Sequence, residues 1–118
     1  MAALNLQWIK YTSGNWCALE TLDLSQAKGT GNYIIWHAGN PGRVVRVGQG
    51  DIPARLAAHL KDTAIMACKK HGTLFVTWAN VEVRYLDGVE RHLAEQWRPL
   101  VGDRFPDVPA IAVNSPWG

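Results

Sequence analysis

Three residues far apart in the sequence, Tyr33, Arg55 and Glu90, carry side chains that together could cut a phosphodiester bond. This hydrolysis requires an attacking water to lose a proton, and it requires stabilisation of the charge that develops on the phosphate. A phenol in a dry, polarised site can relay or accept the proton, and a guanidinium can bind two phosphate oxygens at once. A single carboxylate completed by water suits Mg²⁺, which keeps much of its hydration.

Each of these residues also has an ordinary structural interpretation. Tyr33 could be a core tyrosine of a hairpin strand, with its hydroxyl group hydrogen-bonded. Arg55 could be a surface arginine of an amphipathic helix. Glu90 could be solvated, or paired with Arg91 or His92. The chemical interpretation therefore requires a fold that brings the three side chains together.

The first two predicted elements form a β-hairpin. Residues 32–37 are apolar and rich in β-formers, and residues 43–48 have the character of a returning strand. Between them, residues 38–42 (AGNPG) are turn formers. We therefore expect the two strands to pair in antiparallel fashion.

A helix is predicted directly after the hairpin. Asp51 can cap it, and its first turn tolerates Pro53. Arg55 and His59 are four residues apart and share one face. The neighbouring face is an apolar stripe of Ile52, Leu56 and Leu60.

A third strand at residues 73–78 and a helix at residues 85–97 are predicted next. The helix has a core stripe of Leu86, Val89, Leu93 and Trp97, with Glu90 at the edge of that stripe. Gly88 inside this helix indicates either close packing or a later helix start.

The segments occur in the order found in the GIY-YIG nucleases, which the chain resembles. Residues 31–36 (GNYIIW) resemble the G-[IV]-Y strand of that family. Residues 44–48 (VVRVG) resemble its Y-[IV]-G strand, which a helix with an arginine follows. The segment with Glu90, nine residues before Pro99, resembles the metal-binding helix. The resemblance implies an α/β (α+β) fold, in which a small sheet with an antiparallel hairpin is flanked by helices.

The resemblance also implies roles in a DNA endonuclease. Glu90 would hold one Mg²⁺ or Mn²⁺ ion, Arg55 would grip the scissile phosphate, and Tyr33 would line the site. No second carboxylate stands at a convergent spacing, so the ion would be mostly water-coordinated. The family's second tyrosine, often proposed to accept the proton of water, is replaced by Arg46.

Arg46 has two interpretations with opposite consequences. A guanidinium stays protonated and cannot act as a base, but it can clamp phosphate. If Arg46 replaces a needed phenol, Arg46→Tyr should speed cutting, and if it grips phosphate, the same change should slow cutting. His37 or His59 could handle the proton instead. We favour ordinary interpretations of both histidines, with His37 at the end of a strand and His59 on a helix surface.

Three further residues are expected to bind substrate together with these two histidines. Gly48 belongs to the second motif strand, and Asn114 could replace, from the tail, an asparagine that the family often has shortly after the proline. Arg43 begins a basic middle stretch, whose other members are Arg46, Arg55, Lys61, Lys69 and Lys70. Most such charges are solvated surface, and a phosphate-binding patch is the alternative.

The composition bounds the class of protein. A length of 118 residues and a hydrophobic content of 47% indicate one globular domain, comprising an arm (1–30), a motif-bearing body (31–100) and an extended tail (101–118). A net charge of +2 is compatible with nucleic acid without arguing for it. No apolar run is long enough to span a membrane. Cys17 and Cys68 form no disulfide framework, so we expect reduced thiols and a cytoplasmic protein.

The chain has six tryptophans, which favour core packing over base stacking. Trp36, Trp78 and Trp97 lie in predicted core elements. Trp117 is the best candidate for contact with a partner or a second subunit, so a homodimer stays open. Two other functions also stay open: a degenerate GIY-YIG fold that binds nucleic acid or protein without cutting, and a purely structural protein.

Overall fold

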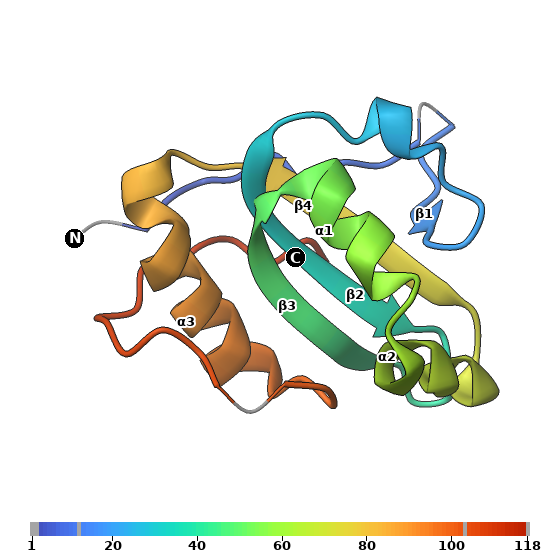
Figure 1. Cartoon of the computed structure of the whole chain (residues 1–118). Coiled ribbons are helices and arrows are strands. Elements are labelled where there is room, and N and C mark those ends of the chain that lie inside the picture. The colour runs from blue at the N-terminus through green and yellow to red at the C-terminus, as the bar shows by residue number, and fades with distance from the viewer. Residues whose placement is uncertain (1–2, 12, 103, 118) are drawn as a thin grey trace.

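The computed structural model describes residues 3–11, 13–102 and 104–117, and it shows an α+β fold built on a four-stranded antiparallel sheet (Figure 1). The strands are β1 (Cys17–Ala18), β2 (Thr30–His37), β3 (Arg43–Asp51) and β4 (Leu74–Asn80), in the order β1-β4-β2-β3. The predicted fold class is therefore confirmed, and the sheet is purely antiparallel.

The predicted hairpin is present and extends further than the sequence indicated, because Thr30 pairs with Asp51. Tyr33 lies opposite Gly48, and Ile35 lies opposite Arg46. Directly opposed residues of antiparallel strands share one face of the sheet. Tyr33 and Arg46 therefore project from the same face. β2 is a central strand between β3 and β4, and its residues enter a hydrophobic core on each face of the sheet, which explains its continuous apolar run.

Over the described ranges, three helices complete the framework, namely α1 (Ile52–His59), α2 (Thr63–Ala67) and α3 (Leu86–Trp97). Short 3-10 turns lie at Leu24–Gln26, Cys68–His71 and Val83–Tyr85. Asp51 caps α1 as predicted, because its side chain accepts a hydrogen bond from the Ala54 amide at 3.2 Å. Asp62 caps α2, a helix that was not predicted from the sequence. Arg98, in a left-handed conformation at φ 46°, ends α3 before Pro99.

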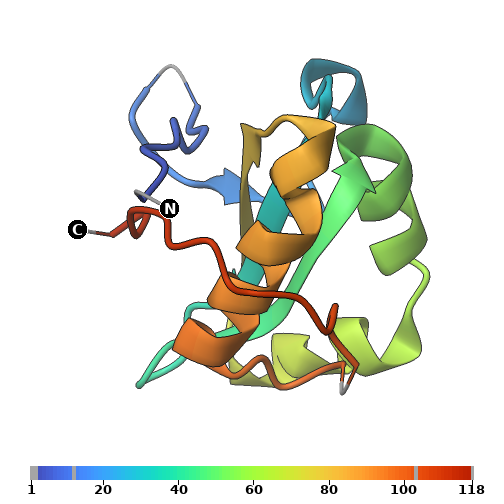
Figure 2. The same cartoon turned by 90° about the vertical axis from the view of Figure 1, so that its left-hand side faces the viewer.

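The helices cover opposite faces of the sheet. In Figure 2, α1 lies on one side of the strands and α3 lies on the other. The α1 face encloses a core around Tyr33, Ile35 and Leu56, and the α3 face encloses a second core around Ile34 and Val89. β3 is an edge strand, and α1 and α3 both contact it.

The arm and the tail both pack on this body. The Ile9 amide donates to the Trp78 carbonyl at 3.0 Å. The Leu100 and Val101 amides donate to carbonyls of β3 at 3.2 and 2.8 Å, so the tail covers part of the free edge. A Cβ on Gly88 would lie 2.6 Å from Ile111, which identifies close packing as the reason for this glycine.

No helix in the described part of the chain is both long enough and apolar enough to cross a membrane.

Candidate active site

A buried tyrosine–histidine pair lies at the centre of the candidate site. Tyr33 Oη on β2 is hydrogen-bonded to Nε2 of His59, the last residue of α1, and the two ring centroids are 5.2 Å apart. Tyr33 is fully buried, and His59 is 5% exposed. Gly48 leaves room for the Tyr33 hydroxyl in this pair, because a Cβ at position 48 would overlap that hydroxyl. The hairpin register therefore fixes a phenol against an imidazole.

The prediction that His59 is a helix-surface residue is wrong. α1 has only eight residues and packs directly against β2 and β3, so its polar stripe also faces protein on one side. His59 lies one turn after Arg55 and contacts Tyr33, while Arg55 stays exposed. The four-residue spacing of Arg55 and His59 indicates that they share one face of α1, but it does not show which of the two side chains enters the protein interior.

Two guanidinium groups act electrostatically on the pair. Burial raises the pKa of Tyr33, and the neighbouring Arg55 and Arg46 oppose that rise. Burial, followed by the positive charges of Arg55 and Arg46, lowers the pKa of His59 to about 4. The His59 ring is therefore neutral near pH 7, and one of its nitrogens can accept a proton.

Arg46 enters the site from β3, on the same face as Tyr33. Its Nε is buried and has no hydrogen-bond partner among the described residues. Its guanidinium lies against Gly102, where a Cβ would overlap Nη1. Gly102 also has φ +101°, a conformation that residues with a side chain rarely adopt. The absence of a side chain at Gly102 therefore leaves room for the Arg46 guanidinium.

We expect Gly102→Ala to destabilise the fold more than Gly14→Ala, its matched control. Both glycines have positive φ, at +101° and +89°, so alanine strains both, at a cost of about 1–3 kcal/mol. A Cβ at Gly102 would meet the Arg46 side chain, whereas no atom of the described residues lies within 4 Å of a Cβ at Gly14. Urea unfolding measures the difference, and equal losses for the two variants would show that Arg46 does not depend on this space.

Glu90 reaches the same region from α3, on the opposite face of the sheet. Burial raises the pKa of Glu90, Arg46 opposes the rise most strongly, Asp87 adds to it, and Arg55 opposes it. The charges of both arginines therefore act on Glu90 as well as on the tyrosine–histidine pair. Arg46 and Arg55 therefore lie near enough to act electrostatically on Tyr33, on His59 and on Glu90.

Asp87 corrects the expectation that no second carboxylate stands near Glu90. It lies three residues earlier on α3, and it accepts a hydrogen bond from Gln49 of β3. Within the described residues, no three His, Cys, Asp or Glu side chains gather into a metal-binding cluster. A half-buried carboxylate with a second one nearby fits a hard ion that keeps most of its water, such as Mg²⁺.

The structure separates three other predicted residues from this group. His37 and Arg43 pair with each other at the far end of the hairpin. Asn114 accepts a hydrogen bond from the Leu6 amide at 2.5 Å, and its Nδ2 donates to the Leu6 carbonyl at 2.9 Å. Asn114 therefore joins the tail to the arm, and both polar ends of its side chain are used in that contact.

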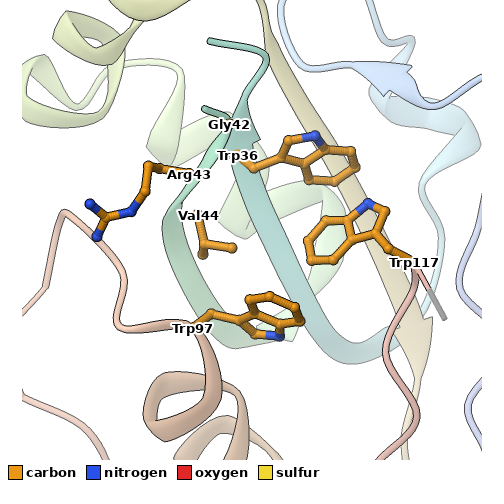
Figure 3. A pocket seen from close by; sticks show the side chains of 6 residues that line it. All are labelled: Trp36, Gly42, Arg43, Val44, Trp97 and Trp117. Atoms are coloured by element: carbon orange, nitrogen blue, oxygen red, sulfur yellow. The ribbon is translucent and has the colours of Figure 1, made fainter. Parts of the chain in front are cut away.

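The tryptophans form a separate surface feature (Figure 3). Trp36, Trp97 and Trp117 surround a pocket of about 230 Å³, with Arg43 at its rim. Trp117 packs edge-on against the other two, with ring centroids 5.0 Å apart in each pair, and it stays 39% exposed. Trp36 and Trp97 are half-buried and Trp78 is buried, so their predicted core location is confirmed.

We expect His59 to make stability fall with decreasing pH. Its pKa is about 4 when folded, below its ordinary value of 6.5, so between these values the unfolded chain binds a proton that the folded site does not. The contribution of neutral His59 to the free energy of unfolding is therefore complete above pH 6.5 and is lost as the pH falls through 4. The loss is on the order of 2–3 kcal/mol.

Urea unfolding of wild type and His59→Gln between pH 7 and pH 4 measures this effect. The variant should lose part of the pH dependence, whereas His92→Gln, at a half-buried position of α3, should keep it. A His59→Gln profile parallel to that of wild type would contradict the assignment.

The sequence matches no protein-family model, no curated protein and no solved structure.

Proposed function

We propose that this chain is an endonuclease-like domain that hydrolyses DNA phosphodiester bonds and depends on one divalent ion. The observation that carries the proposal is the Tyr33–His59 hydrogen bond within the electrostatic reach of two arginines and Glu90. This set combines a proton acceptor, a phosphate-binding charge and a carboxylate. The resemblance to the GIY-YIG nucleases belongs to the same proposal.

The proton chemistry follows from the neutral imidazole. With its ring proton on Nδ1, His59 accepts a hydrogen bond at Nε2 from the Tyr33 hydroxyl. Tyr33 is fully buried in the free chain, so the proposal requires its hydroxyl to open toward the bound substrate. A water that attacks phosphorus then gives its proton to the Tyr33 oxygen, and the phenol proton moves to His59. The phosphorus–oxygen bond on the opposite side then breaks, and the departing oxygen takes a proton from solvent. Tyr33 ends the step unchanged, with the transferred proton on His59.

The two arginines would bind the phosphate. Arg55 is exposed on α1, so it is free to meet a substrate from solvent, while Arg46 lies deeper on β3. Guanidinium groups bind paired phosphate oxygens and stabilise the charge that grows there in the transition state. Both groups act on Tyr33, so a phosphate between them would lie beside the phenol.

Glu90 would hold the Mg²⁺ or Mn²⁺ ion, with water as its other ligands. A bound divalent ion supplies positive charge that polarises the phosphate and stabilises the leaving oxygen. Arg46 and Arg55 oppose the rise in the pKa of Glu90, which favours the ionised carboxylate that a metal requires.

We expect Glu90→Gln to weaken Mn²⁺ binding at least about tenfold, because it removes the charged ligand and keeps the shape. Calorimetric titration of Mn²⁺ measures the affinity. Glu95→Gln is the matched control, since Glu95 is on the same helix but pairs with Arg91 at the surface. Equal affinities of Glu90→Gln and wild type would remove Glu90 from the metal site.

Single-turnover cleavage of supercoiled and branched DNA tests the proposed function. Wild type should cut with Mn²⁺ or Mg²⁺ and should stop cutting when the metal is chelated. Absence of cutting under all conditions would reject the enzyme proposal. A cytoplasmic setting is part of the proposal, because Cys17 and Cys68 are free and buried thiols.

A second candidate function is binding without cleavage. Arg46 favours it, because this residue stands where the resemblance expects a second phenol. Such a module would bind DNA in a titration without metal and would leave the DNA intact when metal is added. The same pair of assays therefore separates the two functions.

A further inference from the structure

A second basic cavity lies at the far end of the hairpin. His37, Arg43, Lys70 and His71 line a space of about 580 Å³ between the end of β2, the start of β3 and the 3-10 turn Cys68–His71. Among the residues that the structure describes, no acidic side chain lines it. The His37 and His71 rings lie 4.9 Å apart.

His37, the buried histidine of this cavity, can donate a hydrogen bond to a ligand. His37 is 4% exposed, and its Nδ1 accepts a hydrogen bond from the Gly39 amide at 3.1 Å. Burial, and then the neighbouring His71 and Arg43, lowers the pKa of His37, so the neutral ring dominates near pH 7. A neutral ring with Nδ1 as acceptor carries its proton on Nε2. That N–H can donate to a ligand oxygen.

The other lining groups add positive charge at the rim. Arg43 and Lys70 are both exposed, and neither forms an ion pair with a described carboxylate. The adjacent Lys69, in contrast, is paired with Glu20 at 2.9 Å. A cavity with N–H donors and two cationic side chains suits an anion with several oxygen acceptors.

The position of the cavity relates it to the candidate active site. Along β2, Tyr33, Ile35 and His37 alternate onto one face, and their partners on β3 are Gly48, Arg46 and Arg43. His37 follows Tyr33 by four positions along the strand, which corresponds to a rise of about 13 Å. Both sites therefore lie on the same hairpin and the same face of the sheet.

We propose that the His37–Arg43–Lys70–His71 cavity is a second phosphate-binding site for the DNA strand that is cut beside Tyr33. The inference rests on the proposed function, because the strand must already bind at Tyr33. A phosphate in the cavity anchors the strand along the hairpin and holds its direction relative to the tyrosine–histidine pair. The affinity it adds comes from charge and N–H donors, so it is independent of base sequence.

The test measures binding of fluorescein-labelled oligothymidylates of increasing length, from about two to about ten nucleotides, in the presence of a chelator. Wild-type affinity should rise in a step at the length that spans both sites, because the second contact becomes intramolecular. The variant Arg43→Gln/Lys70→Gln should lose this step, bind long oligonucleotides about tenfold more weakly, and have a salt slope smaller by about 1.4.

The matched control is Lys28→Gln/Arg84→Gln. It removes the same charge at exposed positions near the start of β2 and the end of β4, which is the opposite end of the sheet from His37. This control should keep the step and a salt slope close to that of wild type. Oligonucleotide binding that has no step in wild type, or that both double variants weaken equally, would overturn the second site.

The assay separates this inference from the proposed function. Binding with a step, together with a failure to cut plasmid DNA, would reject the nuclease and keep the second phosphate site. If wild type cuts DNA but Arg43→Gln/Lys70→Gln binds oligonucleotides as wild type does, the nuclease proposal is kept and the second phosphate site is rejected.

Discussion

We expect Tyr33→Phe to slow single-turnover cleavage of DNA by about 10²–10⁴-fold, the range typical of a lost general acid–base step. The change removes only the hydroxyl that is hydrogen-bonded to His59 and keeps the ring that fills the core. Without the hydroxyl, the proton of the attacking water has no path to the imidazole. His59→Gln should slow cleavage to a similar extent, because it removes the acceptor from the same pair.

Tyr85→Phe is the control for this effect. Tyr85 is half-buried at the start of α3 and packs beside Arg84, away from His59, so its hydroxyl should not matter for the rate. Tyr33→Phe also leaves His59 without its buried partner, which should cost about 1–3 kcal/mol of unfolding free energy. Rates are therefore compared at a temperature where circular dichroism shows both variants folded. A Tyr33→Phe rate within about threefold of wild type would mean that the hydrogen bond is only structural.

We expect Arg46→Tyr to slow cleavage by about 10–100-fold, although it restores the second phenol of the GIY-YIG pattern. The tyrosine–histidine pair already provides the proton path, whereas Arg46 contributes charge beside Tyr33 and Glu90. Loss of one charge-assisted phosphate contact is worth about 1.5–3 kcal/mol, which corresponds to this range of rates.

Two further variants make the result decisive. Arg46→Lys keeps the positive charge without the bidentate geometry, so it should be faster than Arg46→Tyr and slower than wild type. Arg84→Tyr makes the same exchange at an exposed residue that pairs with Glu82, and it should cut at the wild-type rate. Faster cutting by Arg46→Tyr than by wild type would instead identify Arg46 as the residue that blocks a phenol-based mechanism.

The local elements of this protein could be read from its sequence because short-range chemistry determines them. The turn at residues 38–42 between two β-rich runs is sufficient to predict β2 and β3. Asp51 starts α1 because a carboxylate next to a free amide is a local interaction. The 3.6-residue stripe of α3 likewise indicated which residues enter the core. The convergence of Tyr33, Arg55 and Glu90 depended on the order of these elements and on the resemblance.

Tertiary packing alone decided the parts of the site that depend on contacts between distant segments. The inward turn of His59 requires Tyr33, which precedes it by 26 residues, and the room that Gly48 leaves. The space for Arg46 comes from Gly102 in the tail, and Asn114 is held by Leu6 at the other end of the chain. No local preference encodes such contacts, because each depends on how two segments far apart in the sequence meet. The sequence by itself therefore determined the elements and their order, and the packing of α1, α3 and the tail around β3 decided which side chains meet.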